Sequence, residues 1–156
     1  MKTLIAYFSA SGITKHAADI LSQTLNCPAI EIEPEVRYTK ADLNWMDQHS
    51  RSSIEMNDKT SRPAIKKLDF NLADVDTILI GFPIWWYIAP TIINTFLEAH
   101  DFSGKKIILF ATSGGSGFGE TVKYLQPSAP DALIKEGKVF SSHSKNEAYI
   151  AWAHSL

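Results

Sequence analysis

The sequence predicts an α/β fold in which a doubly wound, five-stranded parallel sheet has helices on both faces. Short apolar runs alternate with stretches of helical periodicity, a pattern typical of right-handed βαβ units. Three of the runs are almost continuously apolar, as expected for strands that are buried on both faces. With 156 residues, 45% of them hydrophobic, the chain is long enough to bury a core as one domain over residues 1–156.

Each strand and helix is predicted from its residue types. The strand candidates are residues 3–8, 29–33, 77–82, 106–111 and 138–140. Apolar stripes with helical spacing predict two helices, the first marked by Ile13, Ala17, Ile20, Leu21 and Leu25 and the second by Ile92, Ile93, Phe96 and Leu97. Pro90 suits the first turn of the second helix. Ser144 and Glu147 have the spacing of a capping box that begins the last helix.

The segment of residues 34–76, between the second and third strands, is longer than a single crossover helix requires. Thr39 and Asp42 predict a short capped helix that continues through Trp45. The stretches with loop composition are residues 49–53 and 57–60. Loops of this length in compact domains are usually functional or mobile, so we expect an additional feature here.

Composition and charge exclude several classes of protein. The 15 basic and 17 acidic residues give a net charge of -2, which is too balanced for a protein that binds nucleic acid through phosphate contacts. No apolar run reaches the roughly 18 residues of a membrane-spanning helix, and the first run is too short for a signal peptide. The single cysteine, Cys27, excludes an internal disulfide. We therefore expect a cytoplasmic protein that binds neither nucleic acid nor membrane.

The loop after the first strand is the first candidate binding site, because ligands of open parallel sheets bind beyond the carboxyl ends of the strands. This loop leads directly into a helix and consists of Ser9, Ala10, Ser11, Gly12, Ile13 and Thr14. Three hydroxyls and a glycine at the positive end of a helix dipole are suited to holding a phosphate group. The alternative is that the hydroxyls only cap the helix.

The loops after the third and fourth strands are the other candidates. The third strand is followed by Pro83, Ile84, Trp85, Trp86 and Tyr87, and the fourth by Thr112, Ser113, Gly114, Gly115, Ser116 and Gly117. The first set offers aromatic faces and the second a backbone that a ligand can approach closely. Neighbouring tryptophans in an extended loop point in opposite directions, so we expect one to stack on a ligand and the other to pack inward. The alternatives are a core or oligomer-interface role for the tryptophans and a merely flexible glycine turn.

The residue spacing does not match the motifs of other common ligand or catalytic sites. Glu120 and Thr121 follow the glycines where a P-loop requires Lys and Ser or Thr, and the glycines follow the wrong strand for a dinucleotide fingerprint. The segment around Ser116 lacks the final glycine of a nucleophile elbow, which argues against a hydrolase. The five histidines are scattered and lack the spacing of metal ligands, so no metal site is expected.

Taken together, the three loops resemble those of the flavodoxin-like family. The resemblance extends over essentially the whole chain. The resemblance is strongest to short-chain bacterial flavodoxin-like proteins with a Phe-Pro-Ile-Trp-Trp loop, which here spans residues 82–86. It implies a sheet of order 2-1-3-4-5 that binds flavin mononucleotide (FMN). The phosphate would lie at Ser9, Ser11, Gly12, Ile13 and Thr14, and the isoalloxazine ring between residues 83–87 and 113–117.

The resemblance implies a redox protein that carries electrons through bound FMN, with no catalytic side chain. Unlike the acidic carrier flavodoxins, this chain is nearly neutral and has no tyrosine in the loop after the fourth strand. An NAD(P)H-dependent oxidoreductase that reduces a quinone or another small molecule is therefore the alternative. The partner would be a redox protein or a small-molecule electron acceptor. Residues 34–76, with Trp45 and Arg51, would cover the flavin and form a substrate pocket in the enzyme.

Overall fold

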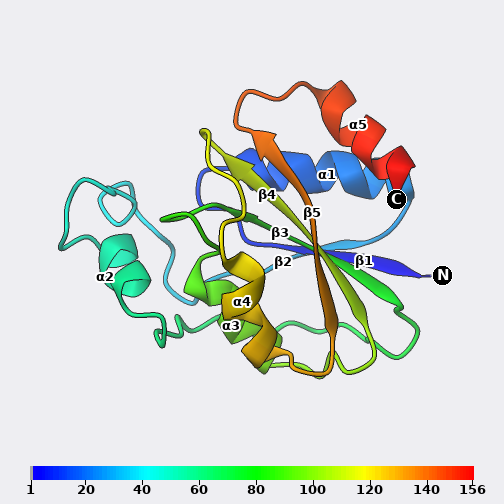
Figure 1. Ribbon diagram of the computed structural model, residues 1–156, viewed down its shortest axis with the longest axis horizontal. Coiled ribbons are helices and arrows are strands. Elements are labelled where there is room, and N and C mark those ends of the chain that lie inside the picture. The colour runs from blue at the N-terminus through cyan, green and yellow to red at the C-terminus, as the bar shows by residue number, and fades with distance from the viewer. Residues whose placement is uncertain (1) are drawn as a thin grey trace.

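The computed structural model describes residues 2–156, and all five of its strands belong to one parallel sheet of order β2-β1-β3-β4-β5 (Figure 1). The strands are β1 (Thr3–Tyr7), β2 (Ala29–Glu31), β3 (Thr77–Pro83), β4 (Lys106–Ser113) and β5 (Leu133–Ser141). This order confirms the predicted fold class. The carboxyl ends of the strands point to the left-hand side of Figure 1.

Helices cover both faces of the sheet. α1 (Ile13–Leu25) and α5 (Asn146–Ser155) pack on one face, and α3 (Thr91–Glu98) and α4 (Thr121–Leu125) on the other, with a short 3₁₀ turn at Gln126–Ser128 (Figure 1). Alternate residues of a strand point to opposite faces. Ile5 of β1 accordingly belongs to the core beneath α1, and Leu4 to the core beneath α3. No helix within residues 2–156 combines the length and apolarity needed to cross a membrane.

The edge strand β5 is longer than the predicted 138–140. Its charged residues Lys135, Glu136 and Lys138 are exposed, so the run lacks the continuous apolar character that identified β3 and β4. A register shift opposite Leu109 and Phe110 accommodates one extra residue of β5. The strand therefore forms by pairing with β4 despite a composition that suggests a loop.

Within the segment between β2 and β3, residues 34–65 form a closed excursion beyond the carboxyl edge of the sheet (Figure 1). Its two ends meet where Pro34 pairs with Ile65, flanked by hydrogen bonds from the N–H of Glu35 to the Ala64 carbonyl (2.9 Å) and from the N–H of Lys66 to the carbonyl of Glu33 (2.8 Å). These contacts fix the neck of the excursion to the end of β2.

The helix of this segment lies later than predicted. Thr39 and Asp42 do exchange the hydrogen bonds of a capping box, at 2.8 and 3.1 Å, but the residues after them form turns. The helix is α2 (Arg51–Asn57), within residues expected to be partly loop, and the Ser50 hydroxyl accepts a hydrogen bond from the N–H of Ser53 at its start. A local cap and tertiary contacts thus outweigh the weak helix propensity of its serines.

The two other predicted helix starts are each displaced. Pro90 occupies the N-cap of α3, one residue before the first turn in which it was expected. α5 begins after Lys145 without a side-chain cap, so Ser144 and Glu147 do not form a capping box. The N–H of Ser144 instead donates to the carbonyl of Ser141, which closes a turn at the end of β5.

Gly81 in the middle of β3 allows the ring of Phe110 on β4 to lie against the backbone, because a Cβ there would overlap that ring. We expect Gly81→Ala to lower the free energy of unfolding by about 1–3 kcal/mol, the usual range for overpacking a core. Urea denaturation measures this loss. Gly114→Ala is the control, since a Cβ at Gly114 would meet nothing within 4 Å. Equal urea midpoints for the two variants would contradict the proposed role of Gly81.

Candidate functional site

The loops after β1, β3 and β4 are joined to one another at the carboxyl edge of the sheet. The N–H of Phe8 donates to the carbonyl of Gly81, and the N–H of Ile84 to the carbonyl of Thr112, each at 2.9 Å. The hydroxyls of Thr14 and Thr112 share a buried hydrogen bond of 2.9 Å. The sheet therefore holds the three predicted loops in fixed relative positions.

The loop after β1 presents backbone N–H groups at the start of α1. The Ser9 hydroxyl accepts hydrogen bonds from the N–H groups of Gly12 and Lys15, both at 3.1 Å. Gly12 has a φ of 94°, a left-handed conformation that glycine adopts without strain. Within the described chain, the N–H groups of Ser11, Ile13 and Thr14 are not used in hydrogen bonds. With no acidic residue in the first turn of α1, this end of the helix is suited to an anion.

The hydroxyls of this loop have different roles. The Ser9 hydroxyl supports the turn, and the Thr14 hydroxyl is buried against Thr112, so both already have hydrogen-bond partners within the protein. Ser11 is exposed, and its hydroxyl has no hydrogen-bond partner within residues 2–156. Ser11 is therefore the side-chain donor of this loop that is available to a ligand.

The loop after β3 is a tight two-residue turn. Trp85 and Ile88 pair across it, with N–H to carbonyl distances of 2.9 and 3.1 Å. Trp86 and Tyr87 between them have φ values of 49° and 69°, the left-handed combination of a type I′ turn, which is uncommon for side chains of this size. Gly119 supports the turn, because a Cβ there would overlap the Tyr87 carbonyl oxygen.

This turn gives the two tryptophans different surroundings. Trp85 packs edge to face against Phe8 and Tyr38, with ring centroids 5.5 and 5.4 Å apart. Trp86 is 37% exposed and Tyr87 is 72% exposed. Trp85 is therefore the more buried ring and Trp86 the more accessible one. The extended loop that was expected to point them in opposite directions is replaced by this turn, and both rings line one cavity.

The glycine-rich loop after β4 is stabilised by Ser113. Its hydroxyl accepts hydrogen bonds from the N–H groups of Gly115 (3.1 Å) and Ser116 (2.8 Å), and pairs with the Ser116 hydroxyl at 3.0 Å. A Cβ at Gly114, Gly115 or Gly117 would meet nothing within 4 Å, and none of the three has a positive φ. The fold therefore does not require glycine here, and the open space beside this backbone is accessible to a ligand.

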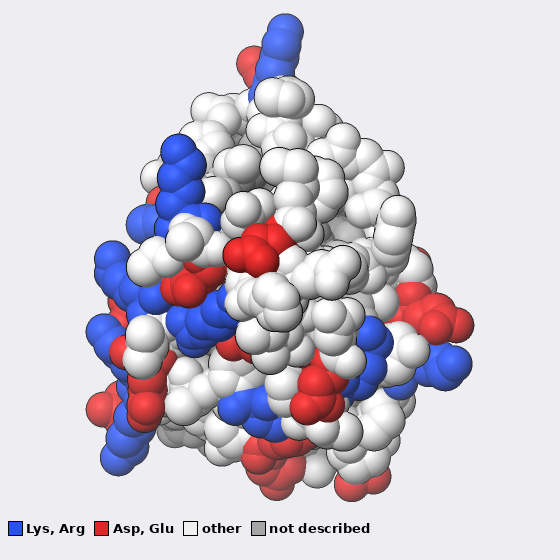
Figure 2. All heavy atoms as spheres, turned by 90° about the vertical axis from the view of Figure 1, so that its left-hand side faces the viewer, with Lys and Arg blue, Asp and Glu red and all other residues white. Residues whose placement is uncertain are grey.

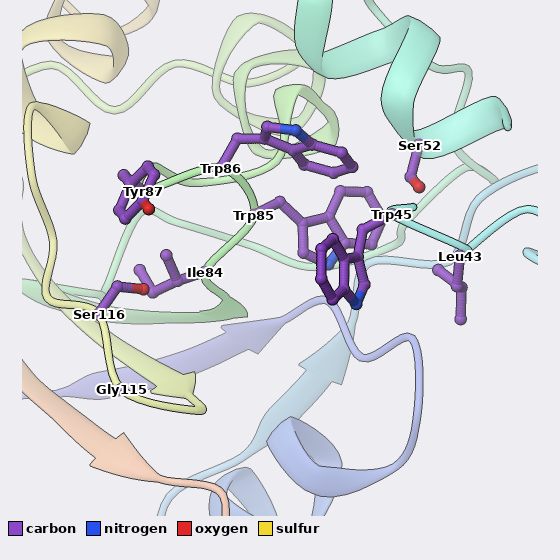
Figure 3. Close-up of a pocket in the computed structure, with 9 residues that line it drawn as sticks. All are labelled: Leu43, Trp45, Ser52, Ile84, Trp85, Trp86, Tyr87, Gly115 and Ser116. Atoms are coloured by element: carbon purple, nitrogen blue, oxygen red, sulfur yellow. The ribbon is translucent and has the colours of Figure 1, made fainter. Parts of the chain in front are cut away.

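A cavity of about 710 Å³ lies between the loops after β3 and β4 and the excursion (Figure 3). This volume is within the range of about 300–1,000 Å³ that is usual for small-molecule sites. The nine lining residues are Leu43, Trp45, Ser52, Ile84, Trp85, Trp86, Tyr87, Gly115 and Ser116. None of these nine is charged, so the cavity would surround a ligand with aromatic faces and dipoles.

The remaining predicted residues lie around this cavity. Ser113, Gly114 and Gly117 line a neighbouring hollow of about 350 Å³. A third hollow of about 360 Å³ is lined by Ser9, Ala10 and Gly12, together with charged side chains of both signs, namely Lys15, Arg37, Glu31 and Glu33. Ser11 and Ile13, which are exposed at the start of α1, line none of the three. Pro83 and the buried pair Thr14 and Thr112 also line none of them; Pro83 ends β3, and the pair joins the loops after β1 and β4.

The excursion contributes residues that the motif analysis missed. Trp45 lines the cavity as expected, but Leu43 and Ser52 belong to no recognisable pattern and are brought there only by the tertiary fold. Arg51 does not line it. Its guanidinium lies 3.8 Å from the centroid of the Tyr38 ring and pairs with Glu55 at 3.1 Å.

Tyr38 connects this charged pair to the aromatic wall of the cavity. Its hydroxyl donates to the Glu55 carboxylate, and its ring packs against Trp85. Burial, with a smaller effect of Glu55, raises the pKa of Tyr38 well above its usual range, so this hydroxyl stays protonated. The cluster positions Trp85 and adds no charge to the cavity.

Part of the surface on this side of the molecule is also poor in charge. Figure 2 shows this side of the molecule, with a broad uncharged area and most charged side chains towards its left and lower margins. Within residues 2–156, no group of three or more metal-ligating side chains is found. The arrangement is suited to a planar, largely apolar ring with an anionic group attached.

Comparisons with known proteins agree with this geometry. A family model described as Flavodoxin matches residues 2–156. A chain from Bacteroides uniformis, named provisionally as a flavoprotein, is 46% identical with a TM-score of 0.90, covering 98% of this chain and 97% of its own. One from Bacteroides eggerthii, also named provisionally as a flavoprotein, is 44% identical with a TM-score of 0.88, covering 99% and 97%.

A more distant structure shares the fold. A flavoprotein from Lactobacillus acidophilus, solved in complex with FMN, is 24% identical with a TM-score of 0.70, covering 95% of this chain and 97% of its own. A comparison with curated proteins finds no match. The match of the family model over residues 2–156 and the sheet order together establish that this chain belongs to the flavodoxin family.

Proposed function

We propose that this chain binds FMN and serves as a redox protein that carries electrons through the flavin. The observation that carries the proposal is the position of an uncharged aromatic cavity beside a loop whose free N–H groups lie at the start of α1. FMN combines the two matching chemical features, a planar ring system and a phosphate. The Lactobacillus acidophilus protein, which has this fold, contains FMN.

The phosphate would be held by the loop of residues 9–14. The N–H groups of Ser11, Ile13 and Thr14 and the hydroxyl of Ser11 are the free donors, while Ser9 and Gly12 maintain the turn. Hydrogen bonds to a charged acceptor are stronger than those between neutral groups. The helix dipole adds favourable electrostatics at this end of α1.

The isoalloxazine ring would lie in the cavity, between the turn at Trp86 and the glycine-rich backbone at Gly115. Bound there, FMN supplies one- or two-electron redox chemistry. The nine lining residues include no Asp, Glu, Lys, Arg or His. The six that belong to the loops after β3 and β4 would therefore bind and orient the ring and exclude water rather than exchange protons; they are Ile84, Trp85, Trp86, Tyr87, Gly115 and Ser116. Tyr87 is the one lining side chain with a titratable hydroxyl, and it is largely exposed.

A second candidate function is an FMN-dependent oxidoreductase that takes hydride from NAD(P)H and reduces a quinone or another small molecule. One observation favours it. The cavity continues past the loops to Leu43, Trp45 and Ser52 of the excursion, which offers space beside the flavin for a second molecule. A carrier that only exchanges electrons with a protein partner does not need this space.

The cofactor is tested by the absorption spectrum of the purified protein. We expect a yellow protein with one FMN per chain and no preference for FAD, because no feature beyond the phosphate loop favours an adenosine group. Extraction of the flavin and chromatography measure its identity and stoichiometry. A colourless protein that fails to take up added FMN would falsify the proposal.

The phosphate loop is tested by Ser11→Ala. We expect FMN affinity to fall by about 1.5–3 kcal/mol, the value of one hydrogen bond to a charged group, and riboflavin affinity to stay unchanged, because riboflavin lacks the phosphate. Titration of the apoprotein with both flavins measures the difference. Thr14→Val is the comparison, since it removes a buried hydrogen bond to Thr112 and should lower the stability of the fold. Equal weakening of both flavins by Ser11→Ala would place the phosphate elsewhere.

The choice between carrier and oxidoreductase is tested by mixing the FMN-loaded protein with NADPH without oxygen. We expect no bleaching of the flavin, because no Lys or Arg lines the cavity to receive the nucleotide phosphates. Dithionite is the positive control and should bleach the flavin completely. Rapid bleaching by NADPH would instead favour the oxidoreductase.

A further inference from the structure

Three serines at the start of α2 differ in how their hydroxyls are satisfied. Ser50 and Ser53 hydrogen-bond to each other at 2.9 Å, and the Ser53 hydroxyl also donates to the carbonyl of Asp47 at 2.8 Å. Ser52 is only 1% exposed, and its hydroxyl has no partner within the described chain. Buried hydroxyls nearly always have a partner, so the exception at Ser52 requires an explanation.

Ser52 is also the serine of the three that lines the large cavity. In Figure 3 its oxygen points from α2 towards the side on which Trp45 and Trp85 lie, while Gly115 and Ser116 lie at the opposite end. The N–H of Ser52 donates to the carbonyl of Asp42 at 3.0 Å, which fixes the residue relative to the turns that contain Trp45. Ser52 is therefore held in place in the wall of the cavity, with its buried hydroxyl on the cavity side of α2.

We propose that this end of the cavity is a subsite for a neutral, planar aromatic carbonyl compound of the quinone type, with Ser52 donating a hydrogen bond to one carbonyl oxygen. Trp45 and Leu43 complete the subsite. The inference rests on the proposed FMN function and deepens it. It names the acceptor class and the residues that select it.

The chemistry of the lining determines this ligand class. A carboxylate, phosphate or ammonium group would lose its hydration here without gaining an opposite charge, because the nine lining residues carry none. Indole faces favour flat rings, and Trp45, which is 71% exposed, can cover a ring from the solvent side. A hydroxyl can donate to a quinone carbonyl and accept from the hydroquinone that forms, so Ser52 can bind acceptor and product.

The proposed reaction is balanced without any further reagent. The quinone receives a hydride and a proton from the fully reduced flavin, which amounts to two electrons and two protons. Both carbonyl groups of the quinone become hydroxyls, and the flavin returns to its oxidised form. The flavin is first reduced by the electron donor that the proposed redox function requires. Dithionite replaces that donor in the experiment.

Binding is tested first, with a ligand that does not react. Acetophenone is neutral and planar with one carbonyl oxygen, and benzoate has a similar shape with a negative charge. In a ligand-observed NMR titration of the FMN-loaded protein, we expect acetophenone to bind and benzoate not to bind. Ser52→Ala should weaken acetophenone binding about tenfold, the value of one hydrogen bond at the upper end of its usual range.

Electron transfer is tested next, by mixing the dithionite-reduced protein with 1,4-benzoquinone and following flavin reoxidation. We expect the rate to saturate with quinone concentration, and Ser52→Ala to raise the half-saturating concentration about tenfold while the maximal rate is retained. Ferricyanide, which is anionic and not planar, is the control acceptor. Its rate should rise linearly with concentration and be the same in both proteins.

Stability separates a ligand-binding role of Ser52 from a structural one. Because the Ser52 hydroxyl has no partner, Ser52→Ala should retain the urea midpoint of the unaltered protein. Ser53→Ala is the matched control on the same helix. It loses two hydrogen bonds and should lower that midpoint, but it should keep the acetophenone affinity of the folded protein.

Two results would overturn the subsite. Unchanged acetophenone binding and an unchanged half-saturating concentration in Ser52→Ala would show that the hydroxyl does not contact the acceptor. Benzoate binding as tight as that of acetophenone would show that the site does not select neutral ligands. Either result in a protein that takes up FMN normally leaves the proposed redox function intact, whereas failure to take up FMN contradicts that function itself.

Discussion

Burial of β1, β3 and β4 on both faces is the constraint on which the rest of the molecule depends. Strands of this kind must be apolar on both sides and need helices above and below, which α1 with α5 and α3 with α4 provide. Because all the strands are parallel, every crossover returns to the same edge, so the loops that follow the strands gather at the other edge. The candidate site is thus a product of the sheet topology, and its residues can be far apart in the sequence.

Within that site, the loops satisfy their own backbone with small hydroxyl side chains. Ser9 and Ser113 each accept two N–H groups, which allows these irregular turns to keep their shape without charged residues. The cavity beside them is therefore free of charge, and its aromatic wall is fixed from behind by the Tyr38, Arg51 and Glu55 cluster. Rigid loops around an uncharged hollow are suited to a flat ring that changes its electron count without moving.

The sequence predicted the centre of this structure more accurately than its margins. The runs for β3 and β4 were placed within one or two residues, because strands buried on both faces have unbroken apolar sequences. The edge strand β5 was reduced to three residues because its exposed face is charged. α2 was missed because the run of serines at its start suggested a loop, although Arg51, Glu55 and Met56 are good helix formers. Ser52 could not have been found from any motif, since only the tertiary fold brings it to the cavity.

The neck of the excursion has a consequence for how members of such a family can diverge. The pairing of Pro34 with Ile65 joins the two ends of a segment of about thirty residues at one point beside β2. Once the ends of a loop are joined, each doubling of its length adds only about 0.6 kcal/mol of closure entropy. Insertions, deletions and substitutions between these two residues can therefore accumulate at little cost to the sheet. The part of the cavity wall that they reshape is the part furthest from the glycine-rich loop, so ligand preference can evolve separately from the fold.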